Sequence, residues 1–416
     1  MFFIKVYFYK MLMMGLKWAV ALIPQPQPVI FTGKDSSLAL IDLITSQQVN
    51  RILLVTDNVL NKLGIADKIC HKLAVHNIEV IIFDQVTPDP NELVVERGIQ
   101  VAKDGNCQLV LGIGGGSSLD AAKMIAVLSS LGNSSNTSPN TSSKKSVKEV
   151  AGLLKIKRRG LPLYLLPTTS GTGSEVTMAA VITDSQHTSK SLVISPKMMP
   201  IATALDPLLM QGMPAKITAD TGFDALTHAL EAFLSTHANE QTNLYALTAI
   251  KLIFKQLPVA YRDGKNIAAR EALAIASCYA GLAFTKAGLG YVHAISHQIG
   301  AKYHLPHGMT NAIVLPHVLR FNLKSSTSRL AQLALEIGLE KSHLSELELA
   351  TNFIKAVIKL QDELAIATSI PQLQKEDVKT LAKAALTEAH FLYPVPQYLN
   401  LAQCQQLINQ LFPALK

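Results

Sequence analysis

The chain has 416 residues, more than one ordinary core holds and enough for two domains of roughly 200 residues each. Hydrophobic residues make up 49% and charged residues 16%, a composition that excludes a largely disordered protein. A net charge of +8 raises the question of a polyanionic partner. The basic residues cluster at Lys144, Lys145, Lys148, Lys155, Lys157, Arg158 and Arg159. No aromatic residues interleave this cluster for base stacking, so we expect a solvated basic surface and no nucleic-acid partner.

The first 23 residues are apolar and aromatic, and they form the N-terminal extension in our division of the chain. Three lysines interrupt this run, namely Lys5, Lys10 and Lys17. No uncharged stretch reaches the roughly 20 residues that a membrane span needs, so we expect no membrane partner. A role at a membrane is the alternative, and Met11, Met13 and Met14 leave the true start codon open.

Between residues 24 and 211, short β-branched runs alternate with helical patterns. This alternation predicts an α/β domain with a Rossmann-like, largely parallel sheet that binds a dinucleotide. The predicted strands are Arg51 to Thr56, Ile78 to Phe83, Gln108 to Ile113, Leu163 to Leu166 and Ile201 to Leu205. A Ser- and Asn-rich insert, Gly132 to Ser146, predicts a mobile surface loop.

The pattern changes after Pro207, where strand-like runs nearly vanish and helical spacing continues to Phe412. Gly212 and Pro214 punctuate this change, so we place an all-helical domain at residues 212–416. The four cysteines are scattered and predict neither a disulfide framework nor a cysteine zinc site. Their spacing favours a reducing, cytoplasmic location.

Two glycine-rich loops follow predicted strands. The first, from Gly112 to Ser118, carries Gly114, Gly115, Gly116 and Ser117 and precedes a helical stretch with Asp120 and Lys123. Glycines remove the side chains that would keep backbone amides and a helix N-terminus away from a pyrophosphate, although a plain tight turn is the alternative. The second loop, Pro167 to Glu175, offers hydroxyl groups that can donate hydrogen bonds to a cofactor.

Asp57 follows the first predicted strand and comes before the glycines, so the order differs from the usual dinucleotide fingerprint. Its carboxylate could accept hydrogen bonds from ribose hydroxyls and repel a 2′-phosphate, which would favour NAD over NADP. The alternative is that Asp57 caps a turn or helix.

A helix predicted around residues 221–233 places Asp224 and His228 one turn apart on one face. The segment from Gly290 to Gly300 repeats this arrangement with His293 and His297, and His304 and His307 follow closely. Pro306 and Gly308 fix the backbone around His307. One aspartate and several histidines at one-turn spacing favour a shared divalent ion over unrelated core histidines.

These motifs together resemble the iron-containing, group III alcohol dehydrogenase family, from roughly Pro24 to the C-terminus. The resemblance implies a dehydroquinate synthase-like fold with an active site between the nucleotide-binding and helical domains. It implies a divalent metal, Fe²⁺ with Zn²⁺ as an alternative, held by Asp224, His228, His293 and His307. His297 is expected near the nicotinamide as the catalytic residue. The residues implied to line NAD are Asp57, Gly114, Gly115, Gly116, Ser117, Thr168, Thr169, Thr172 and Lys190.

Ser118 stands where many relatives have proline, and the polar insert and long N-terminus also depart from the family. None of these touches the metal motifs. The resemblance implies that hydride transfer to and from NAD interconverts a small alcohol and its aldehyde or ketone. The metal would hold the substrate oxygen, and His297 or the cofactor ribose would pass protons to water. We also expect a homodimer or a higher homo-oligomer. The alternatives are a polyol dehydrogenase, a cyclising lyase on the same scaffold, and a non-catalytic metal- or nucleotide-binding protein.

Overall fold

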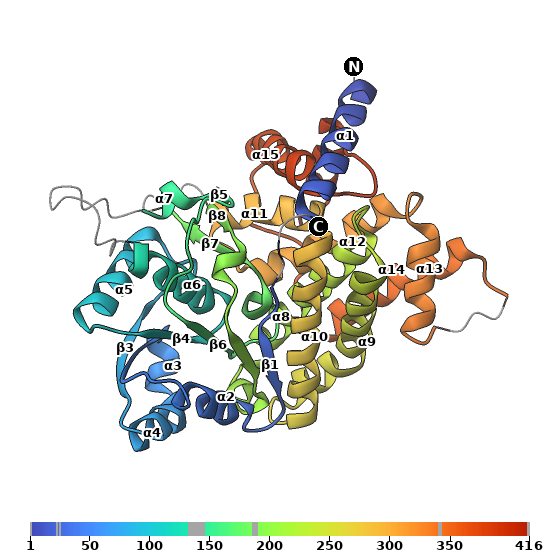
Figure 1. The fold of residues 1–416 in the computed structure, drawn as a ribbon. Helices are drawn as coiled ribbons and strands as arrows, with labels where there is room; N and C mark the ends of the chain where they lie inside the picture. The colour runs from blue at the N-terminus through green and yellow to red at the C-terminus, as the bar shows by residue number, and fades with distance from the viewer. Residues whose placement is uncertain are drawn as a thin grey trace. The chain divides into compact units, whose positions relative to one another are not determined.

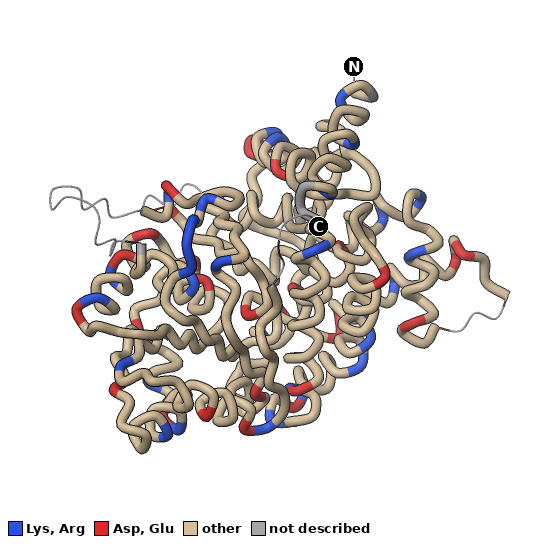
Figure 2. The backbone as a smooth tube through the Cα atoms, viewed as in Figure 1, with Lys and Arg blue, Asp and Glu red and all other residues tan. Residues whose placement is uncertain are grey.

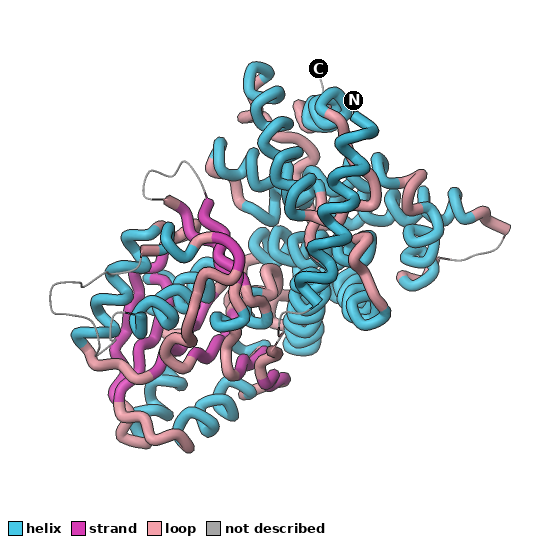
Figure 3. Tube along the Cα trace, turned by 45° about the horizontal axis from the view of Figure 1, so that its top comes forward, coloured by secondary structure: helices cyan, strands magenta, loops and turns pink. Residues whose placement is uncertain are grey.

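A computed structural model gives the arrangement of the chain and describes residues 2–21, 24, 26–131, 146–184, 190–339 and 343–413 (Figure 1). The chain forms two units, one of Pro24–Met213 and one that joins Met1–Ile23 to Pro214–Lys416. Strands occur in the first unit and helices dominate the second (Figure 3). The predicted fold class is confirmed. The loop predicted at 132–146 lies, apart from Ser146, outside the described residues.

The α/β unit contains a six-stranded, fully parallel sheet in the order β1-β9-β6-β4-β2-β3. The strands are β1 (Val29–Thr32), β2 (Arg51–Asp57), β3 (Glu79–Val86), β4 (Leu109–Gly114), β6 (Leu163–Pro167) and β9 (Ala202–Leu205). All five predicted strands are present with slightly different ends. The helices between them are α2 (Ser36–Thr45), α3 (Asn58–Lys62), α4 (Asp67–Val75), α5 (Glu92–Asp104), α6 (Gly116–Leu131) and α7 (Val147–Val150).

Helices cover both faces of this sheet, which explains why its central strands read as continuous apolar runs. Successive residues of β2 point to opposite faces. Leu53 and Val55 pack with α5 and α6 in one core, and Ile52 and Leu54 pack with α2 and α4 in the other. Strands β4 and β6 are buried along their whole length, so the loops that follow them leave the sheet from its buried centre.

A smaller sheet was not predicted from the sequence. It consists of β5 (Gly152–Leu153), β8 (Lys190–Ile194) and β7 (Ala179–Thr183), with β7 and β8 antiparallel. Strand β5 has only two residues, and β8 begins with Lys190 and Ser191, so neither carries enough alternation to stand out.

The helical unit contains one extended apolar core. Its helices are α1 (Phe2–Ala21), α8 (Ala215–Leu234), α9 (Glu240–Arg262), α10 (Ile267–Ala287), α11 (Tyr291–Tyr303), α12 (His307–Asn322), α13 (Thr327–Glu336), α14 (Glu346–Glu363), α15 (Val378–Leu392) and α16 (Leu401–Asn409). Helix α8 lies centrally and packs against α9, α10 and α12. Among the described helices, α10 passes a length and apolarity test for crossing a membrane, but most of it is buried between α8 and α9, as in a core helix.

Candidate metal centre and nucleotide site

Helix α8 carries Asp224 and His228 among largely apolar side chains. Asp224 and His228 lie one turn apart, and His228 Nδ1 is 4.0 Å from Asp224 Oδ2. Both side chains are buried. Gly222, two residues before Asp224, allows close packing on α9, because a Cβ there would lie 2.4 Å from a methyl carbon of Leu257. The pair is therefore held on a helix that has little freedom to shift.

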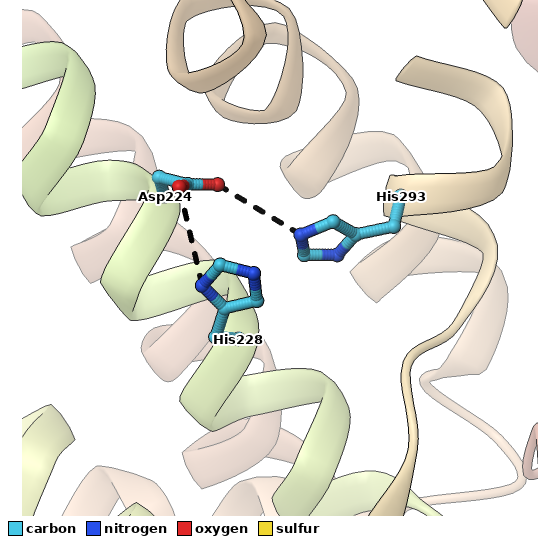
Figure 4. Close-up of side chains that lie close together, drawn as sticks. All are labelled: Asp224, His228 and His293. Atoms are coloured by element: carbon cyan, nitrogen blue, oxygen red, sulfur yellow. Dashed lines mark ion pairs between the residues drawn. The ribbon is translucent and has the colours of Figure 1, made fainter. Parts of the chain in front are cut away.

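Helix α11 brings a third polar side chain to this pair. His293 Nε2 lies 3.8 Å from Asp224 Oδ1, and the imidazole rings of His293 and His228 stack with centroids 4.5 Å apart. Figure 4 shows both imidazoles turned toward the carboxylate. One ligand atom from each of the three residues lies within 4.8 Å of the other two. This spacing suits a single cation, because metal–nitrogen and metal–oxygen bonds are about 2.0–2.2 Å long.

His307 reaches the same carboxylate from the first turn of α12. Its Nε2 is 3.4 Å from Asp224 Oδ1, and its side chain is 34% exposed, against 4% for Asp224. Gly308 permits this approach, because a Cβ at that position would lie 2.2 Å from the Asp220 carbonyl oxygen of α8. Gly308 thus lets the backbone beside His307 pack directly against α8. His307 marks the open side of the cluster.

Glu231, which the sequence analysis did not single out, anchors His293 from behind. Its carboxylate accepts hydrogen bonds from Gly290 N at 2.8 Å and Val292 N at 2.6 Å, and it lies 2.7 Å from His293 Nδ1. A negative charge at the N-terminus of α11 is favoured by the helix dipole. A neutral His293 that donates its Nδ1 hydrogen to Glu231 directs the Nε2 lone pair toward Asp224. The signal in the sequence was a glutamate seven residues after Asp224 on an apolar helix.

Asn311, the second residue that sequence reasoning missed, lies one turn after His307. Its Nδ2 donates to Asp224 Oδ1 at 2.8 Å and lies 3.2 Å from His293 Nε2 and 3.1 Å from His307 Nε2. The amide is fully buried. Asn311 Nδ2 thus contacts three of the four predicted metal ligands, Asp224, His293 and His307, and helps to keep them close together.

Charge balance shows that this cluster suits a cation. Burial opposes ionisation of Asp224, but the imidazoles of His228 and His307 and the hydrogen bond with His293 hold the pKa of the carboxyl well below its usual range. Burial also opposes protonation of His293, yet Glu231 and Asp224 raise its pKa to about 9. Two buried carboxylates therefore require positive charge between them. A divalent ion would supply that charge and displace the proton of His293.

His297 lies beside the cluster and is held by a separate carboxylate. Its Nδ1 is 2.6 Å from Glu388 Oε1 of α15, and its ring stacks with that of His307 at a centroid distance of 5.2 Å. Glu388 also accepts from Gln298 Nε2 at 2.7 Å and Tyr393 OH at 2.5 Å. Burial raises the pKa of Glu388, but its hydrogen bonds and the His297 charge produce a net lowering. Glu388 therefore positions His297 as an ionised hydrogen-bond acceptor.

The two glycine-rich loops of the α/β unit contact each other. Helix α6 begins at Gly116, directly after β4, and Gly114 has a φ of 153° that favours glycine. A Cβ on Gly116 would lie 2.6 Å from Thr172 Cγ2, and one on Gly115 would lie 3.3 Å from Thr169 Cγ2. The N-terminus of α6 thus has bare backbone beside the hydroxyl-rich loop, which is the arrangement expected to receive a pyrophosphate.

A buried lysine joins these two loops. Lys123 Nζ of α6 donates to Ser174 Oγ at 2.8 Å, Thr177 Oγ1 at 3.0 Å and the Ala179 carbonyl at 2.8 Å. Asp120 accepts from the Ser174 hydroxyl at 2.6 Å and from Val181 N at 2.9 Å. Asp120 and Lys123 were predicted only as part of a helical stretch. These contacts fix the second loop to the helix that follows the first.

The remaining residues predicted for the cofactor are more dispersed. Asp57 caps α3 by accepting a hydrogen bond from Leu60 N at 2.9 Å, so its capping alternative is present in the structure. Thr168 N donates to the Gly114 carbonyl at 3.0 Å, which places Thr168 at the glycine loop. Lys190 begins β8 of the smaller sheet and forms an ion pair with Asp89 at 2.6 Å. No described contact joins Lys190 to the glycine loops.

Comparison with known families finds two matches that together cover most of the chain. Residues 26–207 match the family described as iron-containing alcohol dehydrogenase. Residues 218–412 match the C-terminal domain of the Fe-containing alcohol dehydrogenase family. Helix α1 lies before the first matched residue.

Individual relatives give the same result. The NAD-dependent methanol dehydrogenase of Bacillus methanolicus is 38% identical over 340 residues, covering 81% of this chain and 86% of the relative. A crystal structure of 1,3-propanediol oxidoreductase has a TM-score of 0.87 and 35% identity, covering 94% of this chain and all of that one. Sulfoacetaldehyde reductase from Bifidobacterium kashiwanohense, solved in complex with NAD⁺, has a TM-score of 0.82 and 27% identity, covering 94% and 99% of the two chains.

Proposed function

Since the chain belongs to the iron-containing alcohol dehydrogenase family, and is thus an alcohol or aldehyde oxidoreductase, we propose that Asp224, His228, His293 and His307 bind its catalytic metal ion. The observation that carries this proposal is the convergence of three buried ligand groups within 4.8 Å, with His307 3.4 Å from the same carboxylate. One carboxylate and three imidazoles suit iron(II), with zinc as the alternative ion. Glu231 holds His293, and Asn311 contacts Asp224, His293 and His307.

For the cofactor we propose NAD, bound at the glycine-rich loops by Gly114, Gly115, Gly116, Ser117, Thr168, Thr169 and Thr172. The open N-terminus of α6 and the adjacent hydroxyls support this assignment, as does the NAD named for two of the relatives. We propose that Asp57 contacts the ribose of NAD in addition to capping α3. Lys190 has the weakest support, because its ammonium group pairs with Asp89.

When bound, the metal supplies a Lewis acid that favours the alkoxide form of an alcohol, and NAD supplies the hydride acceptor. The protein's own residues handle protons. Hydrogen bonding of His297 Nδ1 to Glu388 directs Nε2 of the imidazole away from that carboxylate, where it can accept a proton and pass it to water. We propose that His297 is this relay.

Replacement of the relay residue tests this role. His297→Ala should lower kcat about 100-fold, the smaller end of the range for general acid–base groups, and should change the pH profile of kcat. Metal content should stay at the wild-type level because His297 is not among the ligands. A variant with wild-type rates and pH dependence would remove His297 from the mechanism.

The substrate class proposed is a small primary alcohol or diol and its aldehyde, because the relatives named above act on methanol and 1,3-propanediol. The test is purification without oxygen, metal analysis, and a panel of alcohols and aldehydes followed by NADH absorbance. Stoichiometric NADH formation with a simple alcohol supports the proposal and contradicts a lyase that uses NAD only transiently. Metal-replete protein that is inactive across the panel would favour a non-catalytic binding protein.

We further propose that the protein is a cytoplasmic homo-oligomer. The four cysteines are scattered along the chain and none of them forms a disulfide in the structure, which supports a reducing compartment. Exposed apolar side chains such as Val59 and Val75 offer surface for subunit contacts. Light scattering coupled to size-exclusion chromatography measures the oligomeric state.

A further inference from the structure

Helix α1 has two apolar faces, and the described residues of the chain cover only one of them. On the covered face, Met13 is 3% exposed, and the ring of Tyr9 lies 4.8 Å from that of His390 and 5.8 Å from that of Tyr398. The Met13 carbonyl contacts His237 Nε2 at 3.1 Å. These contacts hold α1 against α15 and its neighbours, as the N-terminal helix in Figure 1 shows.

The opposite face of α1 carries a stripe of exposed apolar side chains, which we call the outer stripe. Its members follow the three- and four-residue spacing of one helix face, half a turn away from Met13. The outer stripe consists of Ile4 (76% exposed), Tyr7 (70%), Phe8 (56%), Met11 (50%), Met14 (53%) and Trp18 (73%). Large apolar side chains gathered in this way mark an interaction site, unlike apolar residues scattered singly over a surface.

The charge on α1 identifies the kind of partner. Lys5, Lys10 and Lys17 are exposed and lie on the two flanks between the covered face and the outer stripe, and the helix contains no acidic residue. Figure 2 shows the N-terminal helix with blue but no red positions. Lysine stems can extend along an apolar surface while their ammonium groups reach anionic headgroups, and Tyr and Trp rings favour the boundary between headgroups and acyl chains.

We propose that α1 docks the protein on the surface of an anionic lipid bilayer, with the outer stripe in the headgroup–acyl boundary and the lysines against acidic headgroups. A second copy of the chain fits less well, because paired α1 helices would bring lysines together without any acidic residue on either helix to compensate them. The expectation of no membrane partner rested on the length needed to span a bilayer. A helix that lies in the interface needs no such length, so the protein would remain on the cytoplasmic face.

The outer stripe contains the chain's single tryptophan, which makes binding directly measurable. Full-length protein is mixed with vesicles of phosphatidylcholine alone or of phosphatidylcholine with phosphatidylglycerol. We expect flotation with the phosphatidylglycerol vesicles and a blue shift of Trp18 emission as its exposed ring leaves water. Phe8→Ser with Met11→Ser should weaken binding at least about tenfold while Trp18 still reports. Lys5→Gln, Lys10→Gln and Lys17→Gln should weaken it about fivefold per lysine.

The matched control is Leu244→Ser with Leu347→Ser. It removes two exposed leucine side chains from the same unit, Leu244 of α9, which is 65% exposed, and Leu347 of α14, which is 52% exposed. This control should bind vesicles like the wild type, and the helical circular dichroism of all variants should be unchanged. Absence of vesicle binding overturns the proposal. So does binding that survives loss of the outer stripe, which would indicate general attraction to a basic surface.

Two further outcomes also contradict the proposal. Oligomers that dissociate when Phe8 and Met11 are replaced, in protein that ignores vesicles, would identify the outer stripe as a protein–protein interface. A native protein whose measured N-terminus is Met11, Met13 or Met14 would lack much of the outer stripe. Neither result bears on alcohol oxidation, because α1 holds none of the residues assigned to the metal or to NAD.

Discussion

The metal cluster of the helical unit and the glycine loops of the α/β unit are built in opposite ways. Around Asp224, polar side chains are added to an apolar core, where Glu231 contacts His293 and Asn311 contacts Asp224, His293 and His307. At Gly114, Gly115 and Gly116, side chains are absent, and the backbone itself is the surface proposed to bind NAD. The comparison teaches that the first site should fail through lost ligands or lost charge balance, and the second through added bulk.

The largest expected effect follows from removing the central ligand charge. Asp224→Asn keeps the shape but removes the negative charge that all three imidazoles face, so bound metal should be lost and kcat/KM should fall at least about 1000-fold. Metal analysis and initial rates measure this. NAD affinity should change little because the glycine loops are untouched. Asp220→Asn, on the same helix but outside the cluster, is the control. Full activity of Asp224→Asn would refute the ligand assignment.

Added bulk at the other site should have an intermediate effect. Gly116→Ala would place a methyl group 2.6 Å from Thr172 Cγ2 and push the two loops apart, so NAD affinity should fall about 10- to 100-fold with metal content unchanged. Calorimetric titration with NAD measures it. Gly212→Ala is the control, because a Cβ there has no neighbour within 4 Å. Equal effects of the two alanines would contradict a specific role for Gly116.

Within the helical unit, the carboxylates of Glu231 and Glu388 allow metal binding to be tested separately from proton transfer. Glu231→Gln replaces an acceptor of three hydrogen bonds and should weaken metal binding about 10- to 100-fold. Glu388→Gln should leave metal affinity near the wild-type value and lower kcat, since Glu388 contacts His297 and no ligand. Competition with a chelator gives both affinities. If both variants lost metal alike, these two carboxylates would not have the separate roles assigned here.

The smallest expected effect is on how the free energy of unfolding depends on pH, through Glu175 in the second glycine-rich loop. Burial raises the pKa of Glu175 to about 7, so the native state keeps a proton that the unfolded chain releases above roughly pH 4.3. Stability from this group is present below that pH and is lost as pH rises toward 7. Glu175→Gln should remove roughly 2 kcal/mol of this dependence in denaturant unfolding at pH 5 and pH 8. An unchanged slope would assign the pH dependence to other groups.

The sheet and the helical half were predictable because their patterns are local. Strands β2, β4 and β6 appear as apolar runs, since burial on both faces removes polar alternation. Strands β1, β5, β7 and β8 were not predicted. For β5 and β8 the reason is that pairing, of β5 with β8 and of β8 with β7, makes them strands rather than their own composition. The connection of α1 to the helical unit was equally invisible, because it depends on rings of α15 far along the chain.

Sequence alone determined which atoms are available for chemistry, because one-turn spacing puts Asp224 with His228, and His293 with His297, on single helix faces. It also determined the bare backbone at Gly116, since only a missing side chain permits it. Tertiary structure decided which histidines share a carboxylate and which residues orient them. Glu231, Asn311 and Glu388 acquire their roles from helices that pack across the unit, and hydrogen bonds between distant segments depend on distances that no local pattern specifies.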